Sequence, residues 1–283
     1  MKVVETLGDL RAVCGQLPRP LGLVPTMGAL HEGHLSLVRA AAERCHSVGV
    51  SLFVNPAQFA PTEDLAAYPR DLDGDLAKLA AEAVDVVWTP PSDEVYPPGF
   101  QTWVEVEHVT RPLEGAQRPE HFRGVTTVVT KLFHAFEPQF AYFGQKDAQQ
   151  CVVIRRMAAD LNFPLEVVVR PTVREPDGLA MSSRNAYLSP AERRAASVLY
   201  RALTRAAEAY QDGQRQAQAL RQRMVETLAA EPLAETQYVS VANPASLEEL
   251  DGPVESALLS MAVKVGKTRL IDNWLVGDRP LGR

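Results

Sequence analysis

Two histidines three residues apart point most directly to chemistry in this chain. His31 and His34 follow an apolar run, 21–24, and a turn that contains Gly28. A helix with periodic apolar residues begins directly after them. In an α/β protein this order places both imidazoles at the amino end of a helix, where N–H groups and the helix dipole favour phosphate. The spacing therefore predicts a phosphate site.

The histidine pair has two other interpretations, as metal ligands or as ordinary core or surface side chains. A zinc-protease helix carries His-Glu-x-x-His, which brings two imidazoles together one turn apart, and it needs a third ligand. Here the interval is three residues and Gly33 intervenes. The spacing therefore favours phosphate contact over metal binding.

A lysine follows a second strand-like run. The segment Phe143-Gly-Gln-Lys146-Asp147 ends one expected strand and begins a helix. Glycine permits close backbone approach, and Lys146 can bring a compact positive charge to phosphate oxygens. Taken alone, the segment is equally typical of a solvated first turn of a helix.

Two further polar segments complete the set of candidates. Met181-Ser-Ser-Arg184 offers two hydroxyls and a guanidinium that suit polyphosphate oxygens, although an ordinary polar linker has the same composition. Asn55-Pro-Ala-Gln58 follows another strand, and Gln150 lies one turn into a later helix. Amide side chains can bind a small polar substrate without adding charge, while Asn-Pro is also common in simple turns.

These segments carry a resemblance to known enzymes. The 31–34 segment resembles the HxGH signature of the nucleotidyl-transferring superfamily that includes class I aminoacyl-tRNA synthetases, and 181–184 is similar to their Lys-Met-Ser-Lys-Ser motif. The four segments in this order resemble the pantothenate synthetase family (pantoate–β-alanine ligases). The likeness continues through 64–70, 121–125 and 171–175, and so spans most of residues 20–190.

The resemblance implies an ATP-dependent ligase. Such an enzyme condenses (R)-pantoate with β-alanine to pantothenate through pantoyl adenylate, and releases AMP and pyrophosphate. An adenylyltransferase acting on another small acceptor is the alternative, but the neutral Gln58 and Gln150 and the additional domain disfavour it. A non-catalytic nucleotide-binding module would not require every transfer group, and a tRNA synthetase would need a basic anticodon-reading surface.

The resemblance also implies roles for individual residues. Catalytic roles fall on His34 as proton donor and on His31, Lys146, Ser182, Ser183 and Arg184. The implied ATP site comprises Pro25, Thr26, Met27, Gly28, Ala29, Leu30, His31, Glu32, Gly33, His34, Gly144, Gln145, Lys146, Asp147, Val173, Met181, Ser182, Ser183 and Arg184. Gln58 and Gln150 match the pantoate-binding glutamines, and His121 matches a further site residue without an assigned role.

Mg²⁺ is expected on the polyphosphate, as in most ATP-dependent transfers. The segment Asp71-Leu-Asp73-Gly74-Asp75 offers carboxylates. The family commonly shows adjacent aspartates here, and Gly74 interrupts that pair. The protein ligands of the metal are therefore left open, and we expect phosphate and water to hold it.

Composition limits the classes of binding partner and the cellular compartment that we expect for this chain. The net charge of −6 provides no basic surface for nucleic acid. No apolar run approaches the ~20 residues of a membrane span, and the amino terminus lacks the pattern of a signal peptide. Three scattered cysteines indicate reduced thiols, so the sequence predicts a cytoplasmic protein. The resemblance implies a homodimer.

The pattern of elements predicts an α/β fold. Strands are expected at about 21–25, 48–54, 84–88, 140–143 and 166–170, and helices at about 33–45, 71–83, 124–136 and 147–160. This alternation predicts a Rossmann-like parallel sheet with helices on both faces. The Pro-rich segment 89–123 is interpreted as an insertion that could include a short strand pair.

A smaller C-terminal α+β domain is expected after the sheet. A capping box at Ser189-Pro190-x-Glu192 predicts a long helix to about 211, followed by a helix at 213–230 and strands at 236–242, 257–264 and 268–273. We thus predict a Rossmann-like ATP- and pantoate-binding domain over 1–175 and a lid domain over 176–283.

Overall fold

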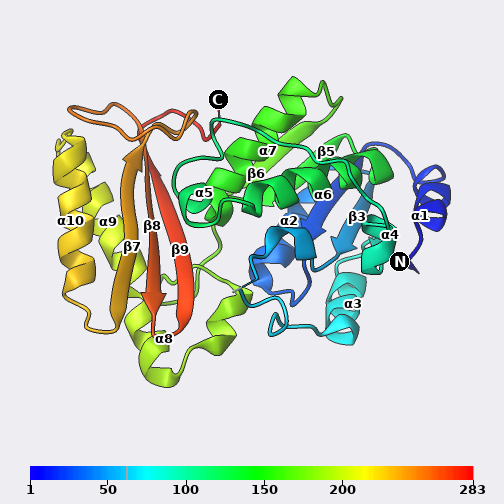
Figure 1. The fold of residues 1–283 in the computed structure, drawn as a ribbon, viewed down its shortest axis with the longest axis horizontal. Coiled ribbons are helices and arrows are strands. Elements are labelled where there is room, and N and C mark those ends of the chain that lie inside the picture. The colour runs from blue at the N-terminus through cyan, green and yellow to red at the C-terminus, as the bar shows by residue number, and fades with distance from the viewer. Residues whose placement is uncertain (62, 283) are drawn as a thin grey trace. The chain divides into compact units, whose positions relative to one another are not determined.

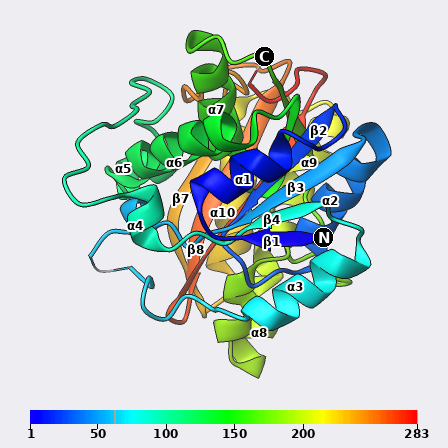
Figure 2. The ribbon, with the colours of Figure 1, turned by 90° about the vertical axis from the view of Figure 1, so that its right-hand side faces the viewer.

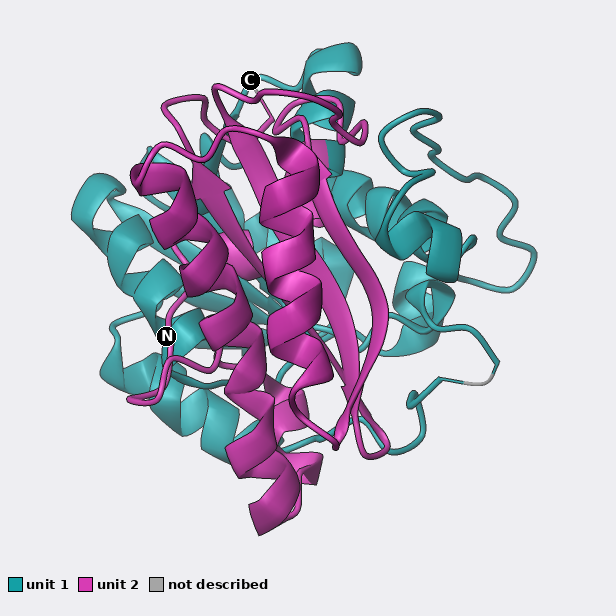
Figure 3. Ribbon diagram, turned by 90° about the vertical axis from the view of Figure 1, so that its left-hand side faces the viewer, with its two compact units in different colours: residues 1–144, 153–170 teal, residues 145–152, 171–283 magenta. Residues whose placement is uncertain are grey.

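The chain divides into two compact units in the computed structural model, which describes residues 1–61 and 63–282. Unit 1 comprises residues 1–144 and 153–170. Unit 2 comprises residues 145–152 and the chain from Pro171 onward (Figure 3). The short segment 145–152, which contains the candidate Lys146, thus groups with the C-terminal part of the chain. The functional domains expected at 1–175 and 176–283 stay a prediction.

Unit 1 is built on a six-stranded sheet (Figure 1). Its strands are β1 (Lys2–Val4), β2 (Leu21–Thr26), β3 (Ser47–Leu52), β4 (Val86–Trp88), β5 (Phe140–Gly144) and β6 (Glu166–Arg170). They lie in the order β1-β4-β3-β2-β5-β6, and every neighbouring pair is parallel. The carboxyl ends of all six strands therefore meet at one edge, where α/β proteins bind their ligands.

Helices cover both faces of this sheet, as predicted. They are α1 (Leu7–Cys14), α2 (Glu32–Arg44), α3 (Leu72–Ala81), α6 (His121–Phe136) and the part of α7 (Ala148–Asp160) that belongs to unit 1. Val38 of α2 and Leu79 of α3 share a buried core with Val24 and Val50 of the sheet. On the opposite face Gly49 lies against Phe136 of α6, because a Cβ at Gly49 would come within 2.8 Å of that ring. In Figure 2, α1 and α6 lie on one side of β1 and β4, and α3 lies on the other.

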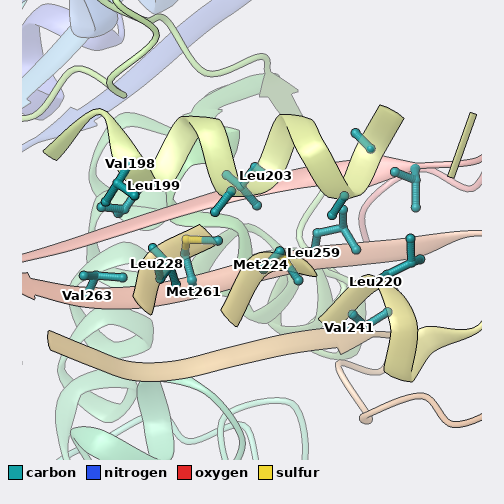
Figure 4. Packing of buried hydrophobic residues seen from close by; sticks show 14 of the residues in the cluster. Val198, Leu199, Leu203, Leu220, Met224, Leu228, Val241, Leu259, Met261 and Val263 are labelled. Atoms are coloured by element: carbon teal, nitrogen blue, oxygen red, sulfur yellow. The ribbon is translucent and has the colours of Figure 1, made fainter. Parts of the chain in front are cut away.

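Unit 2 contains a three-stranded antiparallel sheet of β7 (Ala234–Ala242), β8 (Ala257–Val265) and β9 (Thr268–Val276), in that order. The helices α8 (Pro190–Ala196), α9 (Val198–Gln211) and α10 (Ala217–Ala229) accompany it. Alternate residues of β8 point toward α9 and α10, so Leu259 and Met261 pack with Leu203, Leu220 and Met224 (Figure 4). The predicted α+β character of the C-terminal part is confirmed.

Several elements differ from the sequence prediction. The strand β1 and helix α1 were not predicted. Within 89–123 the chain forms two single-turn helices, α4 (Ser92–Val95) and α5 (Glu114–Gln117), then enters α6 at His121, and forms no strand. The expected helix 190–211 is interrupted at Ser197, whose hydroxyl donates to the Arg194 carbonyl at 2.9 Å and so competes with the backbone ladder. None of the helices in the described part of the chain has the length and apolar character of a membrane span.

Candidate active site

The histidines follow a tight loop at the end of β2, here called the histidine loop (residues 27–31). Thr26 holds its beginning, because its hydroxyl donates to the Ser51 carbonyl at 2.9 Å and accepts from the Gly28 N–H at 3.3 Å. The backbone then turns through positive φ at Gly28 (82°) and at Ala29 (50°). A non-glycine residue in this region costs about 1 kcal/mol or more, so other contacts must impose the conformation.

A buried carboxylate supplies those contacts. Asp75, on the first turn of α3, accepts the N–H of Ala29 and the N–H of Leu30, each at 2.7 Å, and is only 2% exposed. Lys78, one turn further along the helix, donates to the Leu30 carbonyl at 2.9 Å, and its Nζ lies 3.6 Å from Asp75 Oδ1. The loop thus bonds to one carboxylate and one ammonium of the same helix.

The two histidines cap helix α2. His31 Nδ1 accepts the Gly33 N–H at 3.1 Å, and His34 Nδ1 accepts the His31 N–H at 3.3 Å. Their ring centroids are 4.1 Å apart. Since Nδ1 is the acceptor in both rings, each neutral imidazole carries its proton on Nε2 and presents a hydrogen-bond donor there. Two N–H donors at a helix amino terminus form an anion-binding arrangement.

A short helix after β3 carries the polar amides, here called the amide shelf (residues 55–58, including the 3₁₀ helix η1, Pro56–Gln58). The Gln58 side chain accepts from Asn55 Nδ2 at 3.1 Å and donates to the Met27 sulfur at 2.9 Å. Asn55 is buried, and its Oδ1 accepts the hydroxyl of Tyr96 at 2.9 Å. The amide shelf and the histidine loop are therefore directly bonded.

His121 and Arg118 support the amide shelf through the Gln58 backbone. His121 Nδ1 lies 2.9 Å from the Gln58 carbonyl, and Arg118 Nη2 donates to the same oxygen at 3.2 Å. Burial, together with the nearby Arg118, lowers the pKa of His121 to about 4. Burial alone would raise the pKa of Glu63, but two hydrogen bonds from Arg118 hold it below its ordinary value. His121 is therefore neutral at pH 7 and donates to Gln58.

Unit 2 carries the lysine in a single 3₁₀ turn, η2 (Gln145–Asp147), here called the lysine turn. Lys146 Nζ lies 3.6 Å from Asp147 Oδ1, and its side chain is 21% exposed. The carbonyls of Gln145 and Lys146 accept from Asn273 of β9 at 2.8 and 2.9 Å. The lysine turn is thus fixed by the C-terminal sheet.

Of the remaining candidates of unit 2, Gln150 lies in the first turn of α7, whereas Val173 and Met181 lie on a small backbone pairing. The Met181 N–H donates to the Val173 carbonyl at 3.0 Å, and Arg174 and Ala180 form an isolated antiparallel bridge. The loop 181–184 follows, and the Ser182 hydroxyl caps the 3₁₀ helix η3 (Ser183–Tyr187) by accepting the Arg184 N–H at 3.3 Å. This pairing joins the backbones of Val173 and Met181.

Two of the three carboxylates considered for Mg²⁺, Asp71 and Asp75, have structural tasks. Asp71 caps α3 by accepting the Gly74 N–H at 3.1 Å, and a Cβ at Gly74 would lie 2.1 Å from Asp71 Oδ2. Asp75 is occupied by the histidine loop. Among the described residues no group of three His, Cys, Asp or Glu side chains could hold a metal. These carboxylates do not fit a metal site made by the protein alone.

Sequence reasoning missed several supporting residues, among them Asp75, Asn273 and Tyr96. Asp75 was considered only as a metal ligand, although an aspartate in a first helical turn also suits backbone N–H groups. Asn273 was assigned to a strand, and the polar pair Asp-Asn inside an apolar run was the available signal. Tyr96 carried no signal, because only the fold brings it to Asn55.

Known proteins resemble the whole chain. The model of the family described as pantoate-beta-alanine ligase matches residues 2–275. The chain belongs to this family. The pantothenate synthetase of Roseiflexus castenholzii is 58% identical over 276 residues, covering 98% of this chain and 99% of that protein. The enzyme of Pelotomaculum thermopropionicum is 54% identical over 282 residues, covering 98% and 100%.

Solved structures agree with the fold. The crystal structure of pantothenate synthetase from Thermus thermophilus has a TM-score of 0.94 at 48% identity and covers 98% of this chain and 100% of that one. The pantoate-beta-alanine ligase from Francisella tularensis, solved with beta-gamma ATP and β-alanine, has a TM-score of 0.81 at 33% identity, with 97% of each chain covered. The predicted fold class and the predicted identity as a pantoate–β-alanine ligase are confirmed, and an adenylyltransferase is not favoured.

Proposed function

We propose that this ligase uses ATP and activates pantoate as an acyl adenylate. The single observation that carries this proposal is the arrangement of His31 and His34, whose Nδ1 atoms both accept backbone N–H groups at the start of α2. Both rings therefore present Nε2–H donors where the helix dipole also favours an anion. In the Francisella relative the ligands in the crystal are an ATP form and β-alanine, which supports the same substrates here.

In the proposed first step the pantoate carboxylate attacks the α-phosphorus of ATP. An oxygen–phosphorus bond forms to give pantoyl adenylate, and the bond to the β-phosphate oxygen breaks to release pyrophosphate. We assign His34 to the departing pyrophosphate oxygen as hydrogen-bond or proton donor, with His31 on the phosphates beside it. Lys146 provides positive charge near the transferred group, where preorganised donors stabilise the developing charge.

In the second step the amine of β-alanine attacks the activated carbonyl carbon. A carbon–nitrogen bond forms, the bond between the carbonyl carbon and the AMP oxygen breaks, and the amine loses a proton. Gln58 and Gln150 are proposed to hold pantoate through neutral amide hydrogen bonds. The hydrogen bonds of Gln58 to Asn55 and Met27 support this role, because they fix the orientation of its amide.

The remaining nucleotide contacts are proposed from the family resemblance. They comprise the backbone and side chains of Pro25, Thr26, Met27, Gly28, Ala29, Leu30, Glu32, Gly33, Gly144, Gln145, Asp147, Val173, Met181, Ser182, Ser183 and Arg184. Ser182 and Ser183 with Arg184 are assigned to polyphosphate oxygens, for which hydroxyl and guanidinium donors are suited.

Mg²⁺ is proposed to enter with the phosphates of ATP. Asp71 and Asp75 are committed to backbone N–H groups, so phosphate and water are the ligands we expect.

We also propose a cytoplasmic homodimer that binds neither nucleic acid nor membrane. The three buried thiols, none in a disulfide, suit a reducing compartment, and the net charge is −6.

Pyrophosphate exchange tests the proposed activation step. Labelled pyrophosphate should enter ATP when pantoate is present and β-alanine is absent, because a reversible adenylate returns ATP. Adding β-alanine should then yield pantothenate. The control omits pantoate and retains ATP and the metal. A folded protein that binds ATP yet shows no pantoate-dependent exchange would contradict the adenylate mechanism.

A further inference from the structure

One buried amide joins the lysine turn to strand β9. Asn273 Nδ2 donates both of its protons, to the carbonyl oxygens of Gln145 at 2.8 Å and Lys146 at 2.9 Å. Asn273 Oδ1 accepts from Gln145 Nε2 at 3.3 Å. Asn273 is 3% exposed, so each of these groups would lose a partner inside the protein if the amide were removed.

Asn273 is itself held rigidly by its neighbours. Its backbone N–H donates to Asp272 Oδ1 at 2.8 Å. Asp272 accepts two hydrogen bonds from Arg174, at 2.6 and 2.9 Å, in a bidentate pair. Arg174 also donates to the Gly178 carbonyl at 3.0 Å and lies over the ring of Tyr200. The anchor of the lysine turn is therefore a connected and largely buried network.

The chemistry of the contact selects asparagine. Two backbone carbonyls require two donors, and the Gln145 amide requires an acceptor at the same position. A carboxylate of equal size would lose both donors and place negative charge against two carbonyl oxygens. Among isosteric side chains of this size, only the amide satisfies all three partners.

We propose that Asn273 is a positioning residue for the ligase reaction and acts by fixing the backbone that carries Lys146. The inference rests on the role proposed above for Lys146. A 3₁₀ turn of three residues does not determine its own orientation, and the two carbonyl contacts supply that constraint. A misplaced charge loses much of its value in a transition state, since such groups act only within tight geometric limits.

The first measurement compares N273D and N273A with the unmodified enzyme in pantoate-dependent pyrophosphate exchange. Both variants should lose roughly 10- to 100-fold in exchange rate at saturating ATP and pantoate, the scale of a misplacement of about 1 Å. The matched control is N243D in the same unit. Within residues 1–61 and 63–282 the Asn243 side chain acts as an acceptor, from the N–H groups of Ala245 and Ser246, and an aspartate retains both bonds. This control should keep the normal rate.

A double-mutant cycle with K146A separates positioning from general damage. If Asn273 acts through Lys146, N273D and N273A should change the rate of K146A enzyme by less than about 3-fold, because the group that they misplace is gone. Equal losses in both backgrounds would overturn the inference and make Asn273 a purely structural residue. A normal rate for N273A would also overturn it.

Different outcomes of this cycle would contradict the proposed role of Lys146 and the proposed role of Asn273. A normal exchange rate for K146A would overturn the role of Lys146 and with it the purpose of the anchor. A slow K146A enzyme combined with an independent effect of Asn273 would overturn only the anchor. If N273D lowers the melting temperature strongly, N273A provides the cycle, since it removes the hydrogen bonds without adding charge.

Discussion

The histidine loop of unit 1 and the lysine turn of unit 2 are held by buried side chains of opposite hydrogen-bonding character. Asp75 accepts two backbone N–H groups from the histidine loop, whereas Asn273 donates to two backbone carbonyls of the lysine turn. The two side chains have nearly the same size, but asparagine carries an NH₂ group where aspartate carries a second carboxylate oxygen. The turn that offers backbone N–H groups is held by a carboxylate, and the turn that offers backbone carbonyls is held by an amide. The kind of backbone group, and not the unit in which the turn lies, determines which residue fits.

The charge of the anchor also differs between the units. The Asp75 carboxylate makes charge-assisted hydrogen bonds, worth about 1.5–3 kcal/mol each, and Lys78 lies near enough to offset its charge. Asn273 makes neutral bonds, worth about 0.5–1.5 kcal/mol each. Reciprocal substitutions should therefore damage both turns, with the larger loss in unit 1.

The largest effect is expected from D75N. The new amide NH₂ would face one of the two N–H donors, so that donor is left unpaired and the other keeps only a neutral hydrogen bond. We expect the free energy of unfolding to fall by about 3 kcal/mol, and pyrophosphate exchange to fall by ~10²-fold, because the histidine loop loses its anchor. Urea denaturation and the exchange assay measure the two losses.

The matched control for that variant is D73N. Asp73 lies on the same helical turn but is exposed, so only its interaction with the helix dipole, about 0.3–1 kcal/mol, is at stake. If D73N and D75N destabilise the protein equally, the hydrogen bonds to Ala29 and Leu30 do not hold the histidine loop.

Acidification should lower the free energy of unfolding through the protonation of His121, which supports the amide shelf of unit 1. The pKa of His121 is about 4 in the folded protein and ~6.5 in the unfolded chain, so the unfolded chain binds more protons between these values. Stability is therefore complete above about pH 6.5 and falls as the pH drops toward 4. The linkage amounts to about 2 kcal/mol at pH 5.

Urea denaturation of the wild type and H121Q at pH 7 and pH 5 tests this linkage. The wild type should lose about 2 kcal/mol more than H121Q over this interval, since glutamine does not titrate. Carboxylates that do not interact with His121 contribute equally to both proteins and cancel in the difference. Parallel losses would show that His121 titrates normally, and the neutral donor to Gln58 would have to be abandoned.

The sequence alone predicts most of the strands and helices and the candidate site residues. It does not predict the buried side chains, Asp75 and Asn273, that hold the histidine loop and the lysine turn. Val-rich strands and the HxGH segment each carry a local pattern, so the parallel sheet and His31 could be located without coordinates. The hydrogen bonds of Asp75 to Ala29 and of Asn273 to Lys146 join residues 46 and 127 positions apart. No periodicity encodes such a pairing, because it depends on how helices and strands from distant parts of the chain meet.

The smallest expected effect concerns the amide shelf, residues 55–58, which is held by neutral hydrogen bonds. Burial raises the pKa of Tyr96, so its hydroxyl stays protonated at neutral pH and donates to Asn55, which in turn bonds to Gln58. Y96F removes one neutral hydrogen bond, worth about 1 kcal/mol, and should raise the KM for pantoate about 5-fold while leaving the KM for ATP unchanged. The matched control is Y210F, which deletes a hydroxyl bonded to the Glu255 carbonyl in unit 2. Equal changes in the KM for both substrates would separate Tyr96 from pantoate binding and leave Asn55 to orient Gln58 without it.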